Sequence, residues 1–266
     1  MYWSIDPEVF SLGPLSIRYY GLLFAAAFFL GFVIIRRIYE GEGKPEGDLD
    51  SLLTHMMVGT VAGARIGHWL FYDPSYYLSH PIEILKVWEG GLASHGGAVG
   101  IFTSLYIYAR KHPDQPYLWI LDRMVIVIAL AGLFIRTGNF LNSEILGIPT
   151  EVPWAVVFER VDAIPRHPAQ LYEAVAYGAI SAGLYATYAR FRAGTPSGLL
   201  LGLFLVGVFV FRFFIEFVKE RQAAYGLDLP LSVGQVLSVP LVILGTILLI
   251  RALRSLQPAD SQEVRE

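Results

Sequence analysis

The stretch GLLLGLFLVGVFVFRFFIEFV, residues 198–218, decides the fold class of this chain. A helix needs about 20 mainly apolar residues to cross the hydrocarbon core of a bilayer, and this run meets that length. Only Arg212 and Glu216 interrupt it with charge. We therefore predict a transmembrane helix at residues 198–218.

The rest of the chain resembles that stretch in composition. Its 266 residues are 55% hydrophobic and 16% charged, with a mean hydropathy of +0.51, whereas soluble domains carry about 25% charged residues. We predict an all-α, polytopic integral membrane protein of about seven transmembrane helices. The other six apolar stretches are residues 17–38, 49–71, 92–109, 117–136, 169–189 and 233–253.

The polar segments between these stretches suggest a simple organisation. We predict one transmembrane catalytic domain, residues 1–254, followed by a polar tail, residues 255–266. The two longer connections, residues 72–91 and 139–168, mix aromatic residues, prolines and charges, as structured loops at a membrane surface do. Asp6 and Glu8 replace the basic start of a signal peptide, so we expect no cleavable leader.

The distribution of lysine and arginine predicts the orientation, because cytoplasmic loops are enriched in both. More of them fall on the side of the C-terminus, which we place in the cytoplasm, with the N-terminus in the periplasm. The predicted cytoplasmic set is Arg36, Arg37, Lys44, Arg110, Lys111, Arg123, Arg190, Arg192, Arg251, Arg254 and Arg265, against Arg18, Lys86, Arg160, Arg166, Lys219 and Arg221 on the other side.

In this orientation the polar residues of the spans lie toward one face of the bilayer. The predicted spans place them all in the periplasmic half or at its edge. A functional site in that half follows. The residues concerned are Tyr20, Arg65, His95, Arg136, Asn139, Asn142, Glu144, His167, Gln170, Glu173, Arg212 and Glu216.

An arginine inside a span needs a partner, since it costs about 2.5–3.5 kcal/mol at the centre of a membrane helix. Glu216 lies four residues after Arg212, on the same helix face, and is the predicted partner. That pair either stabilises the bundle or holds an anionic ligand. Arg136 adds a second guanidinium at similar depth, and a guanidinium fork suits phosphate oxygens.

Two further segments carry candidate chemistry. RTGNFLNSE, residues 136–144, reads as a helix end with a tight turn at Gly138, and it is rich in groups that bind polar ligands. His95 precedes two glycines, which allow close approach of another helix or a lipid. An imidazole there is either structural or catalytic.

Composition excludes several classes of protein. The chain has no cysteine, so it forms no disulfide and has no thiol nucleophile of its own. Its net charge of −3 provides no basic field for nucleic acid. The six histidines show no metal-ligand spacing, so we expect no metal.

Six motifs together resemble the prolipoprotein diacylglyceryl transferase family. They occur in the family's order and extend from the first predicted span to the sixth, and residues 136–144 are the most specific of them. The motifs are IRYYG (17–21), GARIG (63–67), HGG (95–97), RTGNFLNSE (136–144), RHPAQLYE (166–173) and FRFFIEF (211–217).

The resemblance implies a bacterial inner-membrane enzyme with its site toward the periplasm and no cofactor. It implies transfer of the diacylglyceryl group from phosphatidylglycerol, a membrane lipid, to the lipobox cysteine of a prolipoprotein signal peptide. The products would be a thioether and glycerol phosphate. By position it assigns catalysis to His95, Arg136, Glu144 and Arg212, and headgroup binding to Tyr20, Arg136, Asn139, Gly147, Arg212 and Glu216.

Three positions depart from the family pattern. Ile135 stands where many members have glycine, and Lys219 where arginine is common. Val208 stands where many members have a tyrosine, so the role of that hydroxyl is absent here or is taken by another group.

A mechanism follows as a hypothesis. Arg136 and Arg212 would hold the phosphate and stabilise the leaving anion, while Tyr20 and Asn139 position the headgroup. Either His95 or Glu144 would accept the thiol proton. The alternative is a transporter or channel for a small anion, which predicts polar residues throughout the bilayer depth.

Overall fold

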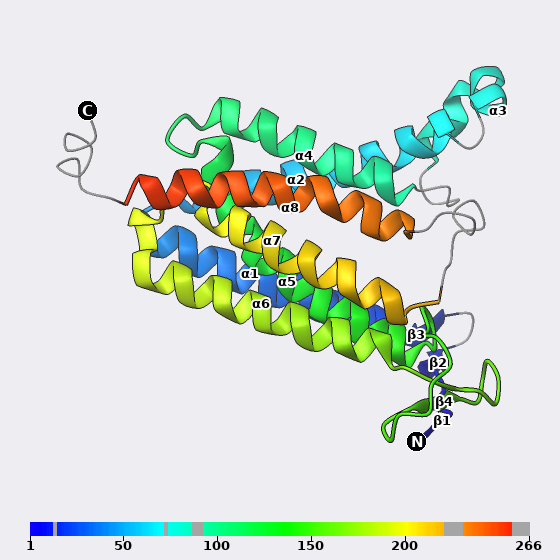
Figure 1. Cartoon of the computed structure of the whole chain (residues 1–266). Coiled ribbons are helices and arrows are strands. Elements are labelled where there is room, and N and C mark those ends of the chain that lie inside the picture. The colour runs from blue at the N-terminus through cyan, green and yellow to red at the C-terminus, as the bar shows by residue number, and fades with distance from the viewer. Residues whose placement is uncertain (13–14, 72–73, 87–92, 221–230, 257–266) are drawn as a thin grey trace. The chain divides into compact units, whose positions relative to one another are not determined.

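The computed structural model describes residues 1–12, 15–71, 74–86, 93–220 and 231–256 (Figure 1). It divides into two compact units. The larger unit contains Met1–Arg37 and the chain from Leu121 onward, and the smaller unit is Ile38–Ile120. The predicted single domain, residues 1–254, stays a prediction.

Helices dominate both units, and each of the seven predicted apolar stretches coincides largely with one long helix. Among the described residues, four segments are long and apolar enough to cross a membrane: α1, α5, residues 199–218 and α8. The α-helices are α1 Tyr19–Gly41, α2 Glu46–Phe71, α3 Pro74–Ser79, α4 Ser94–Lys111, α5 Tyr117–Leu141, α6 Ala169–Phe191, α7 Leu199–Ile215 and α8 Val233–Arg254; the 3₁₀ turns are η1 Pro81–Leu85, η3 Arg192–Gly194 and η4 Glu216–Val218.

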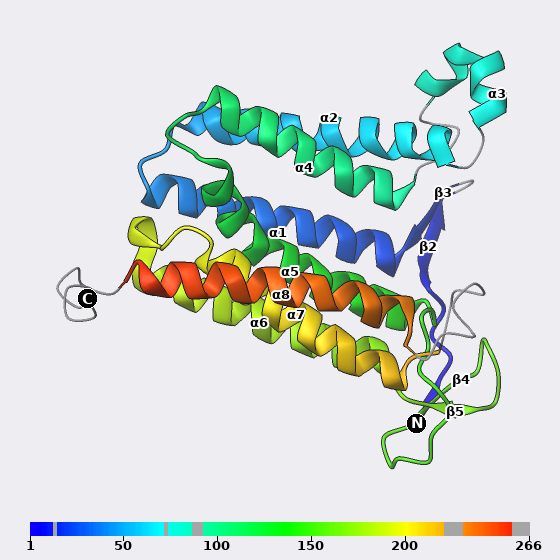
Figure 2. The same cartoon turned by 45° about the horizontal axis from the view of Figure 1, so that its top comes forward.

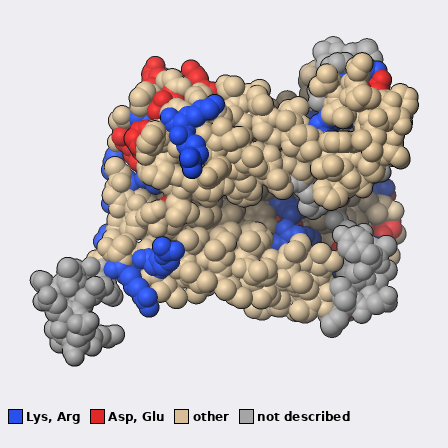
Figure 3. Space-filling model, turned by 90° about the horizontal axis from the view of Figure 1, so that it is seen from above, with Lys and Arg blue, Asp and Glu red and all other residues tan. Residues whose placement is uncertain are grey.

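The surface charge follows the same pattern. In the space-filling view most charged side chains gather near the ends of the helices, and the band between them is largely uncharged (Figure 3). Many large apolar side chains are exposed on the helices, among them Phe28, Phe29 and Val175. Such surfaces suit a hydrocarbon environment.

Glycines bring two helix pairs into close contact. In the smaller unit α2 packs along α4 (Figure 2), and a Cβ at Gly67 would lie 2.7 Å from the Gly96 Cα. In the larger unit α7 packs along α8, where a Cβ at Gly202 would lie 2.9 Å from the Gly245 oxygen. Small residues of this kind allow helix backbones to approach each other within a membrane.

A buried aspartate fixes the start of α7. The Asp122 carboxylate on α5 accepts hydrogen bonds from the backbone N–H groups of Gly198, at 2.7 Å, and Leu201, at 2.8 Å. It is fully buried and satisfies N–H groups that have no partner within the helix. Asp122 thereby holds the helix that carries Arg212.

Short strands modify the prediction of an all-α fold. β1 (Tyr2–Trp3) pairs in parallel with β4 (Val156–Phe158), which pairs antiparallel with β5 (Pro165–Arg166). A separate hairpin joins β2 (Glu8–Leu12) to β3 (Leu15–Arg18). Trp3 packs on Phe140, with ring centroids 4.4 Å apart, in a small core that also contains Leu146, Val156 and Phe158. This core supports the loop that follows α5.

The end of α5 differs from the prediction. The helix continues past Arg136 to Leu141, so Asn139 lies inside it and Gly138 forms no turn. Gly138 instead makes room for the ring of Tyr20 on α1, whose Cδ2 would lie 2.7 Å from a Cβ at that position. The turn comes later, at Ser143 and Ile145, both of which have positive φ.

Candidate functional site

The centre of the site is a buried carboxylate shared by two cations. Glu173 on α6 is fully buried. Its Oε1 accepts a hydrogen bond from Lys219 Nζ at 3.3 Å, and its Oε2 lies 3.1 Å from Arg136 Nε. The contact between Arg136 and Glu173 is an ion pair, but its geometry does not meet the criteria for a hydrogen bond. Glu173 thus ties the end of α5 to the segment after α7.

Glu216 does not pair with Arg212, and that prediction was wrong. Its carboxylate accepts hydrogen bonds from the Ser232 hydroxyl, at 2.8 Å, and from Lys219 Nζ, at 3.3 Å. It also packs on Gly234, where a Cβ would come within 2.7 Å of its carboxyl carbon. The i,i+4 rule assumes a continuous helix, but α7 ends at Ile215 and Glu216 begins a 3₁₀ turn.

Arg212 is the cation that this network leaves over. Within the described ranges of the chain, its guanidinium forms neither an ion pair nor a side-chain hydrogen bond. It lies close enough to the Tyr177 hydroxyl for an electrostatic interaction. An arginine in an apolar helix without a carboxylate partner is available for an anionic ligand.

Tyr177 lies beside both arginines. It is largely buried on α6, one turn after Glu173, and its hydroxyl lies close enough to Arg136 for an electrostatic interaction. Gly132 on α5 provides the space, since a Cβ there would lie 2.8 Å from Tyr177 Cδ2. Val208, where the family pattern has a tyrosine, is a buried residue of α7.

Two asparagine side chains connect Arg136 with the exposed residue Glu144. Arg136 Nη1 donates to Asn139 Oδ1 at 3.3 Å, and Asn139 Nδ2 donates to Glu144 Oε2 at 3.3 Å. Asn142 donates to the other Glu144 oxygen at 3.2 Å. Gln170 holds the same turn by donating to the Glu144 backbone oxygen at 2.6 Å. Glu144 itself is exposed.

Gly147 lies where three backbone segments meet. A Cβ at this position would collide with the His167 carbonyl, and it would lie 2.9 Å from the Val218 oxygen. Backbone bridges join Gly147 to Lys219 and Pro149 to Arg166. The position therefore requires glycine for packing, and its predicted contact with a headgroup stays a prediction.

Arg166, a buried residue, stabilises the place where these three backbone segments meet. It donates to the Gly147 oxygen at 3.2 Å and pairs with Asp162 at 2.7 Å and Glu220 at 3.3 Å. The hydrogen bond to Asp162 raises the pKa of Arg166 and lowers the pKa of the Asp162 carboxyl. Arg166 thereby holds the loop after α5 in place at Gly147.

His95 and Arg65 belong to the smaller unit. His95 is the second residue of α4, and its side chain lies outside what the structure describes. Arg65 is buried and donates to the backbone oxygens of Glu83, at 2.6 Å, and Ile84, at 2.8 Å. Its guanidinium thus holds the η1 turn.

The larger unit brings together Tyr20, Arg136, Asn139, Glu144, Arg212 and Glu216 around a network that the sequence alone did not assign. Sequence reasoning placed Glu173 in the periplasmic half without a role, named Lys219 only for its charge and as a departure from the family pattern, and did not single out Tyr177 or Ser232. Glu173 and Lys219 carried a signal, since each is a charge at the end of an apolar stretch. Nothing in the sequence distinguished Tyr177 from its aromatic neighbours.

Comparisons with a family model and with known proteins all indicate the same family. The family model described as prolipoprotein diacylglyceryl transferase matches residues 7–251. The phosphatidylglycerol–prolipoprotein diacylglyceryl transferase of Chloroherpeton thalassium is 51% identical over 97% of this chain and 96% of its own length. The enzymes of that name from Tolumonas auensis and Bacteroides fragilis are 51% and 42% identical, over 94% and 91% of this chain and 96% and 92% of their own lengths.

Proposed function

The chain belongs to the prolipoprotein diacylglyceryl transferase family. From that premise we propose that it transfers the diacylglyceryl group of phosphatidylglycerol to prolipoproteins. The thiolate of the lipobox cysteine attacks the glyceryl carbon and forms a C–S bond. The C–O bond to phosphate breaks, and glycerol phosphate leaves with the electron pair. The observation that carries this assignment is that Arg212, which like Arg136 lies close to Tyr177, pairs with no carboxylate in the described part of the chain.

We place the protein in the bacterial inner membrane with seven spans, its N-terminus in the periplasm and its C-terminus in the cytoplasm. The four apolar segments of the structure support a membrane location, and the excess of basic residues on the C-terminal side supports the orientation. The arginine cluster, Arg136 and Arg212, then lies in the periplasmic half, where a translocated cysteine and a lipid headgroup meet.

The two arginines have different roles in this proposal. Arg136 is held by Glu173 and Asn139, so it presents a fixed guanidinium. Arg212 is free to bind the phosphate of the donor lipid and to stabilise the negative charge that grows on the leaving oxygen. Cations arranged in advance around a leaving group lower the barrier because they need not reorganise during the reaction.

His95→Gln tests which group accepts the thiol proton. A thiol with a pKa of about 8.5 needs a base or a cationic field to react at neutral pH, and Glu144 is the other candidate. If His95 is the base, we expect the variant to lose the acidic limb of the pH–rate profile near pH 6.5. The measurement is initial transfer rate from pH 5 to 9, with Glu144→Gln alongside. An unchanged profile in His95→Gln assigns the role to Glu144 or to another group.

Tyr177→Phe tests the hydroxyl beside the arginines. We propose that Tyr177 supplies at this site the hydroxyl that Val208 lacks, by holding Arg136 and donating toward the phosphate. Hydrogen bonds to charged groups contribute about 1.5–3 kcal/mol, so we expect kcat to fall about tenfold or more. The measured quantities are kcat and KM, with Tyr185→Phe, an exposed tyrosine of the same helix, as the control. Equal kcat for both variants would contradict the assignment.

Purified protein in phosphatidylglycerol vesicles tests the function directly. We expect glycerol phosphate to appear only when a lipobox peptide is present, and not when its cysteine is replaced by serine. Solute flux without lipid turnover is the result that an anion transporter predicts. The names of the relatives give the transporter alternative no support.

A further inference from the structure

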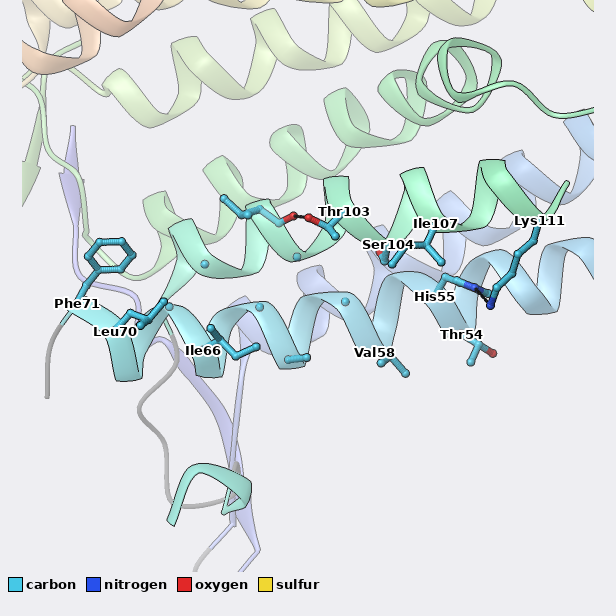
Figure 4. A pocket seen from close by; sticks show the side chains of 17 residues that line it. Thr54, His55, Val58, Ile66, Leu70, Phe71, Thr103, Ser104, Ile107 and Lys111 are labelled. Atoms are coloured by element: carbon cyan, nitrogen blue, oxygen red, sulfur yellow. Dashed lines mark hydrogen bonds between the residues drawn. The ribbon is translucent and has the colours of Figure 1, made fainter. Parts of the chain in front are cut away.

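An open groove runs along the paired helices α2 and α4, and the reaction proposed above does not use it (Figure 4). Its volume is about 800 Å³, and all its lining residues belong to the smaller unit. Both walls carry exposed apolar side chains, including Val58 and Ile66 on α2 and Val99 and Ile107 on α4. The glycines at the α2–α4 contact, where the two backbones approach each other closely, form its floor.

The length of the groove suits a lipid chain. The residues of α2 that line it run from Thr54 to Phe71, which at 1.5 Å per residue is about 26 Å of helix. One leaflet contributes about half of the 30 Å hydrocarbon core. The groove is therefore deep enough to take an acyl chain that enters from the Thr54 end.

Of the described residues that line the groove, Lys111 is the one that carries a charge, and it lies at that end. His55 Nδ1 lies 2.7 Å from the Ser51 carbonyl oxygen, which only accepts, so Nδ1 carries the proton. His55 Nε2 is then an acceptor and receives a hydrogen bond from Lys111 Nζ at 3.2 Å. A lysine ammonium has three donors, and Lys111 forms no ion pair with any described carboxylate. Figure 4 shows Lys111 and His55 together at this end of the groove.

We propose that the Lys111 half of the groove binds an anionic phospholipid, with its phosphate on Lys111 and an acyl chain along Val58 and Ile107. In the orientation proposed above, Lys111 lies at the cytoplasmic surface, so this lipid belongs to the cytoplasmic leaflet. Basic pockets between membrane helices on that side are typical binding sites for anionic headgroups. The site shares no residue with the arginine cluster.

Charge decides between a lipid and a signal peptide as the occupant. The apolar segment of a signal peptide would also fit a groove of this length, but its basic N-terminal region lies on the cytoplasmic side. That region would meet the ammonium of Lys111. Repulsion between like charges disfavours the peptide, whereas an anionic headgroup gains an ion pair.

Photocrosslinking of the full-length protein tests the proposal. The probes are phosphatidylglycerol and phosphatidylcholine that carry a diazirine at the end of the same acyl chain, each diluted into phosphatidylcholine nanodiscs. Cross-linked residues of α2 and α4 are identified by peptide mass spectrometry. We expect the anionic probe to label the groove about fivefold more than the zwitterionic probe, since one basic residue at the surface contributes about 1 kcal/mol.

Two matched variants separate a site from general attraction to the surface. Lys111→Gln should abolish the preference for the anionic probe. Arg110→Gln removes the same charge from the neighbouring residue, which is exposed and does not line the groove, and should keep the preference. Thr103→Phe, at an exposed position of the wall, should fill the groove and lower labelling by both probes.

Three results would overturn the proposal. The first is equal labelling by the two probes, which would show ordinary contact with bulk lipid. The second is a preference that survives in Lys111→Gln. The third is displacement of the anionic probe by a synthetic signal peptide with equal effect on wild type and Lys111→Gln, which would make the groove a peptide site. None of these results bears on the transferase activity, which is measured separately.

Discussion

Arg212→Ala is expected to lower the rate of diacylglyceryl transfer about 100- to 1,000-fold, the usual cost of removing one group that stabilises developing negative charge. The loss follows from the position of this guanidinium, which forms no ion pair with the described part of the chain. In our proposal its charge is neutralised only by the phosphate of the donor lipid. The measurement is initial rate of glycerol phosphate release at saturating lipobox peptide.

Arg212 serves the fold little, so the same variant should remain folded. Removing a partner of a buried ion pair leaves an uncompensated charge, but Arg212 pairs with no carboxylate among the residues that the structure describes. We expect its thermal unfolding midpoint in detergent to match that of Arg251→Ala, which removes an exposed arginine of α8. Near-normal transfer by Arg212→Ala would refute the proposed role, and loss of folded protein would show that the arginine is structural.

Arg212→Lys distinguishes charge from geometry. Lysine keeps the positive charge but replaces the planar fork, which binds two phosphate oxygens together, with a point charge. We expect partial activity between that of wild type and Arg212→Ala. Activity equal to that of the alanine variant would show that two-point contact with the phosphate is essential.

The sequence predicted the helices well because one physical constraint governs them. A bilayer requires long apolar helices whatever their neighbours are, so residues 198–218 and their counterparts are visible without tertiary information. The same reasoning failed at helix ends. Gly138 was interpreted as a turn, yet it lies inside α5, where its lack of a side chain leaves room for the ring of Tyr20. A sequence does not show which residue packs on a glycine.

The charges of the site show the same limit. Sequence spacing paired Arg212 with Glu216, since only local neighbours can be compared along a chain. The structure pairs Glu216 with Lys219 and Ser232 and gives Arg136 to Glu173, which lies on another helix. These partners come from α6, the turn after α7 and the start of α8. Arg136, Arg212 and Glu216 were found from the sequence, but their pairing required the fold.

The buried network around Glu173 leads to a second large effect, on stability. Glu173→Ala removes the carboxylate that Arg136 and Lys219 share and leaves two largely buried cations without it. The side chains of Arg136 and Lys219 are only 16% and 9% exposed, and Glu173 is 1% exposed. Breaking a buried ion pair by removing one partner costs about 3–5 kcal/mol. We expect a loss of this size in the free energy of unfolding, measured by denaturant titration in detergent.

Glu220→Ala provides the matched control, because Glu220 pairs with Arg166 at 3.3 Å but is 54% exposed. An exposed ion pair contributes about 0–1 kcal/mol, so this variant should be nearly neutral. The double variant Glu173→Ala with Arg136→Met should recover part of the loss, since Lys219 keeps its contact with Glu216 whereas Arg136 has lost the carboxylate with which it paired. If Glu173→Ala costs no more than Glu220→Ala, the shared carboxylate does not organise the site. A large loss that Arg136→Met relieves would show that Glu173 neutralises Arg136 from the protein side and leaves Arg212 to be neutralised by the substrate.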